Sequence, residues 1–261
     1  MTSPVIQNGL VVQGRVLGAL MLREMHTING NSKLGYLWVL IQSVFSMAIF
    51  WALRTYMGAH APGGMGMALF LAVGFGIWSI FSVGITKTMS AVEGNKALLT
   101  FPQVTEFDVM LSRVIVVTAT QLVTSILIIG TSLLFGAVFR PNDLLICIGV
   151  LICAPLCTLG IGMILGSLAV FIPVLNKLVP MVLRIFFFLS GVFFSISAFK
   201  QDIAEILLLN PILQAVELMR MSLHDGYVVE GLNFSYLAGF TLTSLVIGGF
   251  LERYVRSRRK D

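Results

Sequence analysis

The chain has 261 residues and a formal net charge of +5, and it is 57% hydrophobic but only 11% charged. Soluble domains carry roughly 25% charged residues, so the composition excludes a soluble globular protein and indicates one that crosses a membrane several times. A self-energised ATPase is also excluded, because the sequence contains no G-x-x-x-x-G-K-[ST] loop that could hold ATP phosphates.

Residues 1–30 are predicted to form a cytoplasmic amphipathic helix at the membrane surface, because they contain neither a span nor the cleavage pattern of a signal peptide. Over residues 5–28, one helix face is apolar and the opposite face basic: Leu10, Leu17, Met21 and Ile28 against Arg15, Arg23 and His26. Glu24 lies near the apolar face, where an unpaired carboxylate is costly, so we expect it to have a partner. The helix could be a simple membrane anchor, or its polar side chains could also touch a cytoplasmic protein.

Six apolar segments are each long enough to cross a bilayer, which takes about 20 mostly apolar residues in a helix. They cover residues 35–57, 67–89, 109–138, 144–171, 178–199 and 233–251. We therefore expect an all-α membrane protein in which residues 31–261 form one domain with six transmembrane helices.

Basic residues outside the spans predict the orientation, since cytoplasmic loops are enriched in Lys and Arg. One side collects Arg15, Arg23, Lys33, Lys87, Lys96, Lys177, Arg253, Arg256, Arg258, Arg259 and Lys260, and the other Arg54, Arg140, Lys200 and Arg220. The richer side is predicted to be cytoplasmic, and it includes both termini. We attribute the basic tail to contact with anionic lipid rather than with nucleic acid.

The loop between the second and third spans, SAVEGNKALLTFPQVTEFD, predicts a short helix. Glu93 and Lys96 are three residues apart, as neighbours on one helix face are. Leu98, Leu99 and Phe101 then form an apolar patch before Pro102 ends the element. Such an apolar knob would fit a groove on a soluble subunit, although a solvated turn would also explain the loop.

The segment 200–232 is long for a connection in a compact protein. Its two apolar stretches are each too short to span and are separated by Asn210-Pro211. We predict two short re-entrant helices that meet at this dipeptide. Because re-entrant backbone is tolerated only against protein or a water-filled cavity, these helices would lie at the outer mouth of a pathway.

Four cations are predicted at membrane depth, Arg54, Lys87, Arg113 and Arg184, and no acid accompanies them. Most lie near span ends, where a long side chain can reach the interface. Arg184 lies deeper in the fifth span. Since desolvating an arginine is expensive, we expect Arg184 to face water, a neighbouring helix or an anionic group of a substrate or lipid.

Two predicted helix faces suit a sliding sugar chain, because aromatic rings can cover the C–H faces of sugars while hydroxyl groups exchange hydrogen bonds with them. The faces are Phe187, Ser190, Phe194 and Ser197 in the fifth span, and Trp38, Gln42, Phe45 and Tyr56 in the first. We expect them to line a translocation pathway together with Arg184. Ordinary helix packing, with serine at the interface, would produce the same patterns.

No catalytic or metal site is predicted. The three histidines fall on different loops or faces, and the serines within the spans have no base at helical spacing that could activate them. Cys147, Cys153 and Cys157 lie together in the fourth span, but their spacing matches no zinc pattern and suits small core residues.

Four groups of residues together resemble one family. They are Leu22-Arg23-Glu24 with Leu34-Gly35-Tyr36-Leu37-Trp38; Ala91-Val92-Glu93-Gly94-Asn95; Asn210-Pro211 with Glu217-Leu218 and Arg220; and Gly226-Tyr227 with Glu230-Gly231 and Tyr236-Leu237-Ala238. They are similar to the first-span start, the coupling helix, the outer re-entrant segment and the approach to the last span in ABC-2-type permeases for capsular polysaccharide or O-antigen. The resemblance runs from about residue 20 to the C-terminus and is most specific for capsule exporters of Gram-negative bacteria.

The resemblance implies an inner-membrane homodimer of six-span subunits with a pore between them, which exports a lipid-linked and often acidic capsular polysaccharide. Two ATP-binding cassette subunits would hold ATP and Mg²⁺, and this chain would bind no cofactor. They would dock on Arg23, Glu24, Glu93, Lys96, Leu98, Leu99 and Phe101. Asn210, Pro211, Glu217 and Arg220 would form the outer re-entrant gate. In capsule systems a periplasmic adaptor and an outer-membrane channel continue the route.

The sequence departs from the family pattern at Gln42-Ser43, where relatives often carry Glu-Pro, and at Gln214, where they often carry His. The first departure removes a carboxylate and a kink from the first span. Other functions stay open: the same machinery with O-antigen, a teichoic-acid-like polymer, a lipid or a drug as cargo; a secondary transporter or channel that works alone; or a membrane scaffold. The lack of acids in the spans argues against an ion-coupled carrier.

Overall fold

The computed structural model describes residues 9–29, 35–58, 60–101, 103–134 and 139–258. Within these ranges every regular element is a helix, which confirms the all-α prediction. The helices are α1 (Gly9–Asn29), α2 (Gly35–Tyr56), η1 (Pro62–Gly64), α3 (Met67–Met89), α4 (Ala91–Gly94), α5 (Glu106–Leu134), α6 (Leu144–Phe171), α7 (Leu175–Leu189), η2 (Ile196–Ala198), α8 (Gln201–Leu207), α9 (Pro211–Leu223) and α10 (Phe234–Arg258).

Four of the described helices, α3, α5, α6 and α10, are long and apolar enough to cross a membrane. A fifth crossing would require α8 and α9 together, which are bent by 108° at the break between them. The predicted second and fourth spans coincide with α3 and α6, and the predicted first span with α2. The protein is therefore a helical bundle with several membrane-spanning helices, while the number six stays a prediction.

The predicted fifth span, 178–199, is wrong in its extent. The helix α7 ends at Leu189 and has only 15 residues. Gly191 follows with φ of +70°, a left-handed conformation that favours glycine and stops a right-handed helix. The carbonyl groups of Gly191 and Val192 accept hydrogen bonds from Arg220 instead of continuing a helix. Gly191 is thus a local stop signal that the apolar run concealed, and the turn after it is held by a contact with a residue far along the chain.

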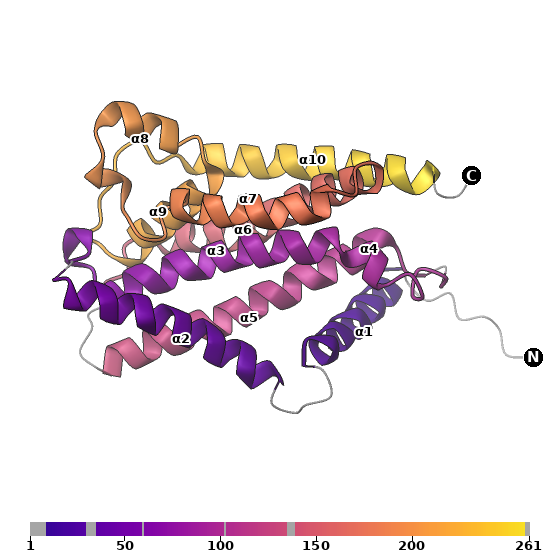
Figure 1. Ribbon diagram of the computed structural model, residues 1–261, viewed down its shortest axis with the longest axis horizontal. Coiled ribbons are helices and arrows are strands. Elements are labelled where there is room, and N and C mark those ends of the chain that lie inside the picture. The colour runs from indigo at the N-terminus through magenta and orange to yellow at the C-terminus, as the bar shows by residue number, and fades with distance from the viewer. Residues whose placement is uncertain (1–8, 30–34, 59, 102, 135–138, 259–261) are drawn as a thin grey trace, which may run out of the picture.

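Helices α3, α7 and α10 run nearly parallel along the length of the bundle, whereas α2 and α5 are inclined to them, and α3 lies in the middle (Figure 1). Of the most apolar 18-residue stretch of α3, 72% is buried inside the molecule, whereas the corresponding share for α10 is 22%. Helix α6 packs against both of these helices. Gly162 and Gly166 of α6 lie at its contact with α3, where a Cβ on Gly162 would come within 2.6 Å of the Thr88 Cβ. Glycine thus allows the close approach of two spanning helices.

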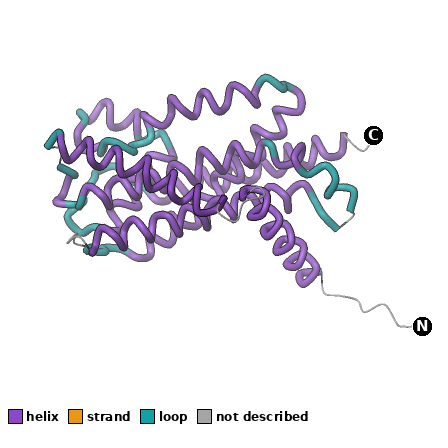
Figure 2. Tube along the Cα trace, turned by 60° about the horizontal axis from the view of Figure 1, so that its bottom comes forward, coloured by secondary structure: helices purple, strands orange, loops and turns teal. Residues whose placement is uncertain are grey.

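The two ends of the bundle differ. Helices α1 and α4 lie at the end where α10 finishes, whereas η1, α8 and α9 lie at the other (Figure 1). Helix α1 runs at an angle to the bundle axis (Figure 2). Its most buried side chains are Leu20 and Glu24, while Leu17 and Met21 of the predicted apolar face are half-buried. The face of α1 that is buried is therefore centred closer to Leu20 than the predicted apolar face is. The division into an interface helix over 1–30 and a domain over 31–261 stays a prediction.

Candidate functional site

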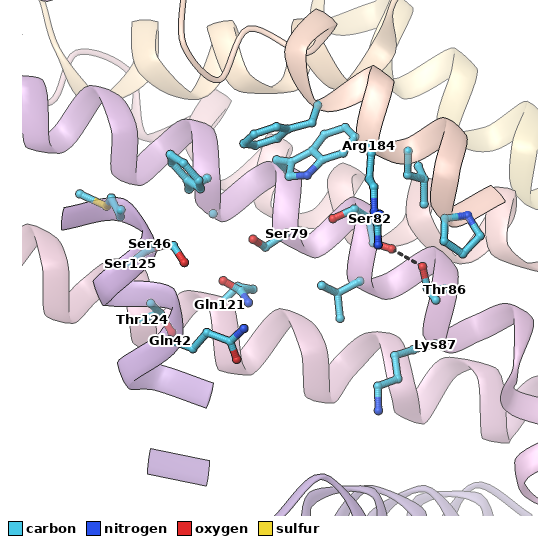
Figure 3. Close-up of a pocket in the computed structure, with 18 of the residues that line it drawn as sticks. Gln42, Ser46, Ser79, Ser82, Thr86, Lys87, Gln121, Thr124, Ser125 and Arg184 are labelled. Atoms are coloured by element: carbon cyan, nitrogen blue, oxygen red, sulfur yellow. Dashed lines mark hydrogen bonds between the residues drawn. The ribbon is translucent and has the colours of Figure 1, made fainter. Parts of the chain in front are cut away.

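A cavity of about 1010 Å³ lies between α2, α3, α5 and α7 (Figure 3). Ser79, Ser82 and Thr86 follow one face of α3 along its wall. The remaining polar lining is Gln42 and Ser46 from α2, Gln121, Thr124 and Ser125 from α5, Arg184 from α7, and Lys87, Ser90 and Arg113 toward the α4 end. A cavity with this many hydroxyl and amide groups offers both donors and acceptors to a polar ligand.

Arg184 is the most distinctive group in this cavity. Its side chain extends from α7 toward Ser82 of α3 (Figure 3), and it is exposed. Within the described part of the chain it forms no hydrogen bond or ion pair. The prediction that Arg184 faces a polar space is therefore consistent with its position on the cavity wall, and its contact with an anionic group stays a prediction.

The predicted polar and aromatic face of the fifth span does not exist as a helical stripe, because α7 ends before Phe194 and Ser197. Phe187 does line the cavity, and its ring lies 5.7 Å from that of Phe75, between centroids. Ser190 is fully buried and donates a 2.6 Å hydrogen bond to the Phe186 carbonyl.

Phe194 packs edge-on against Phe199, with centroids 5.0 Å apart. Ser197 lies in η2 and bonds to Ser195. These two residues belong to the turn after α7 rather than to the cavity.

The predicted face of the first span is only partly gathered at the cavity. Gln42 lines it, together with Ser46 one turn later. Phe45 and Tyr56 are 64% and 93% exposed and are not part of the lining. Trp38 lies in α2, but its side chain falls outside the described residues.

The predicted outer gate residues form the start and the core of α9. Asn210 caps the helix by accepting a 3.0 Å hydrogen bond from the Ile212 N–H, and Pro211 occupies its first turn. Glu217 and Arg220 lie about two and three turns further along α9, and both are 0% exposed.

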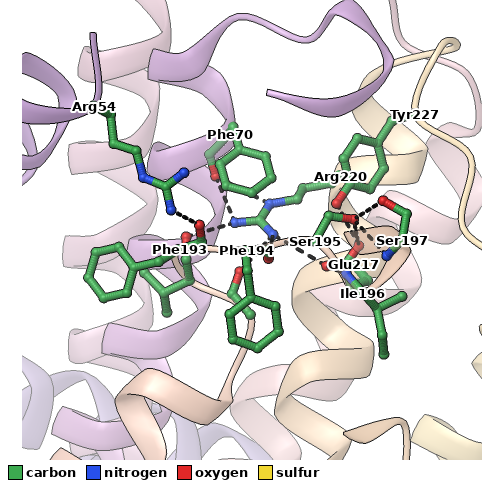
Figure 4. A network of polar contacts seen from close by, with 12 residues as sticks. Arg54, Phe70, Phe193, Phe194, Ser195, Ile196, Ser197, Glu217, Arg220 and Tyr227 are labelled. Carbon is green, nitrogen blue, oxygen red and sulfur yellow. Dashed lines mark hydrogen bonds and ion pairs between the residues drawn. The ribbon is translucent and has the colours of Figure 1, made fainter. Parts of the chain in front are cut away.

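Arg220 is surrounded by carbonyl groups (Figure 4). Its Nη1 donates to Gly191 at 2.7 Å and Phe194 at 3.2 Å, and its Nη2 to Val192 at 3.0 Å. Nη2 and Nε also donate to Phe70 on α3, at 3.0 and 3.3 Å. The guanidinium therefore ties α9 to α3 and to the turn after α7.

Glu217 completes this network as an acceptor (Figure 4). Its carboxylate lies 3.5 Å from Arg220 Nη1, and it accepts hydrogen bonds from the Ile196 N–H at 3.2 Å and from Tyr227 Oη at 2.6 Å. Burial raises the pKa of Tyr227, so the phenol keeps its proton and donates to Glu217. Arg54 of α2 reaches the same turn through the Phe193 carbonyl. A buried ion pair with this many partners fixes the geometry of its surroundings.

The predicted coupling residues divide into exposed and folded-back groups. Helix α4 ends at Gly94, so Glu93 lies on it and Lys96 in the turn that follows, and both are exposed. Phe101 is 59% exposed, as expected of an apolar knob.

Leu98 and Leu99 differ from that expectation, because they are partly buried against a cluster that includes Leu20, Val92 and Val109. They therefore connect the α4 loop to α1 and α5 rather than projecting with Phe101.

Polar contacts hold α1 on this loop and on the adjoining ends of α3 and α5. Gln13 donates to Asp108 of α5, and Arg23 to Asn95. Glu24 is buried and lies 3.3 Å from Arg113 Nε and 3.5 Å from Lys87 Nζ.

The expected partner for Glu24 is therefore confirmed, and the expectation that no acid accompanies the two cations Lys87 and Arg113 is wrong. The reason is that the acid comes from α1, which is far from both residues in the sequence.

The cavity is also lined by polar residues that we did not predict from the sequence, namely Ser46, Ser79, Ser82, Thr86, Gln121, Thr124 and Ser125. The hydroxyl residues of α3 recur at spacings of three and four, which a search for a polar helix face could have found. No comparable signal joins them to the residues of α2 and α5, because only the packing of the helices does.

Known proteins are similar to this chain over most of its length. The family model described as ABC-2 type transporter matches residues 15–224. The polysialic acid transport protein KpsM of Escherichia coli is 28% identical over 247 residues, which cover 95% of this chain and 96% of that protein.

Two capsule polysaccharide export inner-membrane proteins are more distant. CtrC of Neisseria meningitidis is 21% identical, over 92% of this chain and 90% of its own. BexB of Haemophilus influenzae is 22% identical, over 93% of this chain and 91% of its own length. The family match covers α1 to α9 almost completely, and on this ground the chain belongs to the ABC-2 type transporter family.

Proposed function

We propose that this chain is the membrane subunit of an ABC exporter that moves a lipid-linked capsular polysaccharide across the bacterial inner membrane. The observation that carries the proposal is the polar cavity of about 1010 Å³ inside a bundle of membrane-spanning helices. Its family membership supports the exporter class, and its similarity to a polysialic acid transport protein and to two capsule polysaccharide export proteins supports the cargo. ATP and Mg²⁺ would be held by two separate ATP-binding subunits.

The chemistry of the cavity suits a sugar polymer. The hydroxyl face of α3 can exchange hydrogen bonds as successive sugars pass, since each serine or threonine both donates and accepts. Phe187 and Trp78 offer aromatic surface, and their centroids lie 5.6 Å apart. Arg184 would attract the acidic groups of the polymer or the phosphate of its lipid anchor.

A second copy of the chain would close the cavity on the side of α2 and α7. Both helices line the cavity and also carry exposed apolar side chains, including Phe45 and Ile49 on α2 and Ile185 on α7. Apolar surface beside a polar pathway suits a helix partner in the membrane. This supports the homodimer with a pore between its subunits.

The orientation and the remaining spans belong to the same proposal. The basic side chains near α1, α4 and the end of α10 support a cytoplasmic location for that end and for both termini. Helices α8 and α9, with their 108° bend, would enter the outer leaflet and return as a re-entrant pair. A periplasmic adaptor and an outer-membrane channel would receive the polymer beyond them.

Coupling would proceed through the α4 loop. Exposed Glu93, Lys96 and Phe101 are accessible to an ATP-binding subunit. Leu98 and Leu99 lie beneath them and contact the cluster shared by α1 and α5. A movement of the docked subunit would therefore reach α1 and the cavity-lining helix α5 through direct contacts.

The test begins with gentle purification of the chain from its native membrane and identification of its partners by mass spectrometry. A soluble subunit with a Walker A motif, in about equal amount, is the expected result. Polymer transport by the chain alone in liposomes without ATP would contradict the proposal and favour a self-sufficient carrier or channel.

The cargo is tested by expression in an encapsulated strain that lacks its own permease. Surface polysaccharide should appear with the wild-type chain, fall by at least tenfold with Arg184→Gln, and disappear with the paired change Leu98→Asp and Leu99→Asp. Export of O-antigen, a teichoic-acid-like polymer, a lipid or a drug in place of capsule would contradict the proposed cargo. Glu205→Gln, an exposed change on α8, is the matched control.

A further inference from the structure

The α4 end of the cavity contains a second cationic position, separate from Arg184. Lys87 and Arg113 both line the cavity there, and both lie within 3.5 Å of the Glu24 carboxylate from α1. The Lys87 side chain leaves α3 on the side of the indigo helix α1 (Figure 3). One carboxylate is thus shared by two cations on the wall of a cavity that is open to a ligand.

The hydrogen bonding of this cluster is incomplete. Arg113 Nη1 donates to the Lys87 carbonyl at 2.8 Å and to Ser90 Oγ at 2.9 Å. Arg113 Nε is buried and has no hydrogen bond, although it lies 3.3 Å from Glu24 Oε2. The arginine side chain is only 10% exposed. A buried guanidinium with an unfilled donor is costly unless another acceptor can approach it.

The charges around the cavity favour an anion. Lys87, Arg113 and Arg184 line it, and Glu24 is the acid that contacts two of these three cations. Arginine and lysine together are the groups that bind phosphate oxygens, arginine through its fork of donors and lysine as a point charge.

We propose that Lys87, Arg113 and Ser90 form a phosphate-binding site that Glu24 occupies as a built-in competitor. A phosphomonoester or pyrophosphate group entering the cavity would replace the Glu24 carboxylate on Lys87 and on Arg113 Nε. The inference rests on the proposed function only for the source of this group, which would be the anchor of the lipid-linked polymer.

Displacement of Glu24 would also loosen α1. Among the described residues, other polar contacts still hold α1, including Gln13 to Asp108 of α5 and Arg23 to Asn95 of the α4 loop. Occupancy of the cavity by a phosphate would in this way reach the surface where the ATP-binding subunit is expected. Binding of the cargo's phosphate would thus change the position of α1 by displacing the Glu24 carboxylate.

Binding of defined probes to the full-length chain in detergent tests the site without any need for export or ATP. The probes are dioctanoyl phosphatidic acid and inorganic pyrophosphate, with dioctanoyl phosphatidylcholine as the neutral comparison, and the dissociation constants come from calorimetric titration. Binding of phosphatidic acid alone would identify a lipid headgroup as the ligand, and binding of both would identify any phosphate. Binding of neither would overturn the proposal.

Variants separate competition from simple structural support. Glu24→Gln should tighten phosphatidic acid binding by tenfold or more, because it removes the competitor, and Lys87→Gln should weaken it by about tenfold. Lys87→Arg should retain binding, and Glu205→Gln at the opposite end should change nothing. Equal affinities of the wild type and Glu24→Gln, within twofold, would overturn the role of Glu24.

Lys87→Gln keeps the test decisive if Glu24→Gln fails to fold, because the contact between Glu24 and Arg113 stays in place. Hydrogen exchange of α1 gives a second readout. Phosphatidic acid should speed amide exchange over Gly9–Asn29 in the wild type. Tight binding without any change in α1 exchange would show that the carboxylate is not displaced, and the proposal would fail even if the exporter function were established.

Discussion

Each end of the bundle is tied by a buried arginine, but the two arginines are bonded differently. Arg220 donates to the carbonyls of four residues and contacts Glu217, and nothing of it is exposed. Arg113 has two hydrogen bonds through one nitrogen, leaves Nε unbonded, and shares Glu24 with Lys87. Both are desolvated cations, yet one is fully matched and the other is not.

The difference indicates different tasks. A guanidinium whose donors are matched by carbonyl groups from separate segments holds those segments in one arrangement. A guanidinium with a free donor beside a shared carboxylate can exchange partners at lower cost, since its present state is already incomplete. We therefore regard the α9 end as the fixed part of the bundle and the α1 end as the part that can rearrange.

The largest effect should come from breaking the fixed end. Arg220→Met would leave the buried Glu217 carboxylate without its cation and the carbonyl groups around Arg220 without that donor, and we expect a loss of about 3–5 kcal/mol in the free energy of unfolding. Detergent-induced unfolding followed by circular dichroism measures this. Arg184→Met, a change at an exposed arginine without a partner among the described residues, should cost less than about 0.5 kcal/mol. A similar stability of the two variants would remove the distinction.

A smaller loss is expected from Tyr227→Phe. The change removes the 2.6 Å hydrogen bond to the buried Glu217 carboxylate and should cost about 1–3 kcal/mol, because the acceptor stays buried. Tyr236→Phe is the matched control, since Tyr236 Oη donates to the Leu209 carbonyl at 2.7 Å at an exposed position. If both variants unfold at the same detergent concentration, burial does not distinguish the two hydrogen bonds.

The turn that wraps Arg220 can be tested through its backbone. Gly191→Ala forces a side chain into the left-handed region and should cost about 1–2 kcal/mol. Gly239→Ala in α10 has open space around the new Cβ and should be neutral or slightly stabilising, because alanine favours a helix. Thermal unfolding of the two variants side by side gives the comparison, and a tolerated Gly191→Ala would mean that the turn does not depend on glycine.

The smallest effect on stability should come from the α1 end. Lys87→Gln removes a contact at 3.5 Å from a side chain that is 37% exposed, so water screens much of it and the cost should be about 0.2–1 kcal/mol. The same unfolding assay measures this. A loss as large as that of Arg220→Met would show that the α1 end is as rigidly bonded as the α9 end.

The sequence was a good guide wherever apolar length decided the outcome. The bounds of α3 and α6 coincide with the predicted spans, because each helix is one uninterrupted apolar run. The need of Glu24 for a partner also followed from the cost of a bare carboxylate on an apolar face.

Long-range contacts could not be predicted in the same way. The turn after α7 is held by Arg220, which follows Gly191 by 29 residues, and the partners of Glu24 lie on α3 and α5. The cavity combines side chains from four helices. Periodicity describes one element at a time, so it cannot show which polar faces meet.

The early end of α7 has a consequence for the lipid around the protein. Fifteen helical residues rise about 22 Å, whereas the hydrocarbon layer of a bilayer is about 30 Å thick. Apolar side chains of α7 outside the cavity lining, among them Leu178, Met181 and Val182, are exposed. Wherever lipid rather than the proposed second subunit borders α7, the bilayer would have to thin, at a cost of a fraction of a kcal/mol for each Å. Acyl-chain length would then be one of the conditions for transport, and the membrane would be thinnest beside the cavity, where a lipid-anchored polymer has the shortest distance to cross.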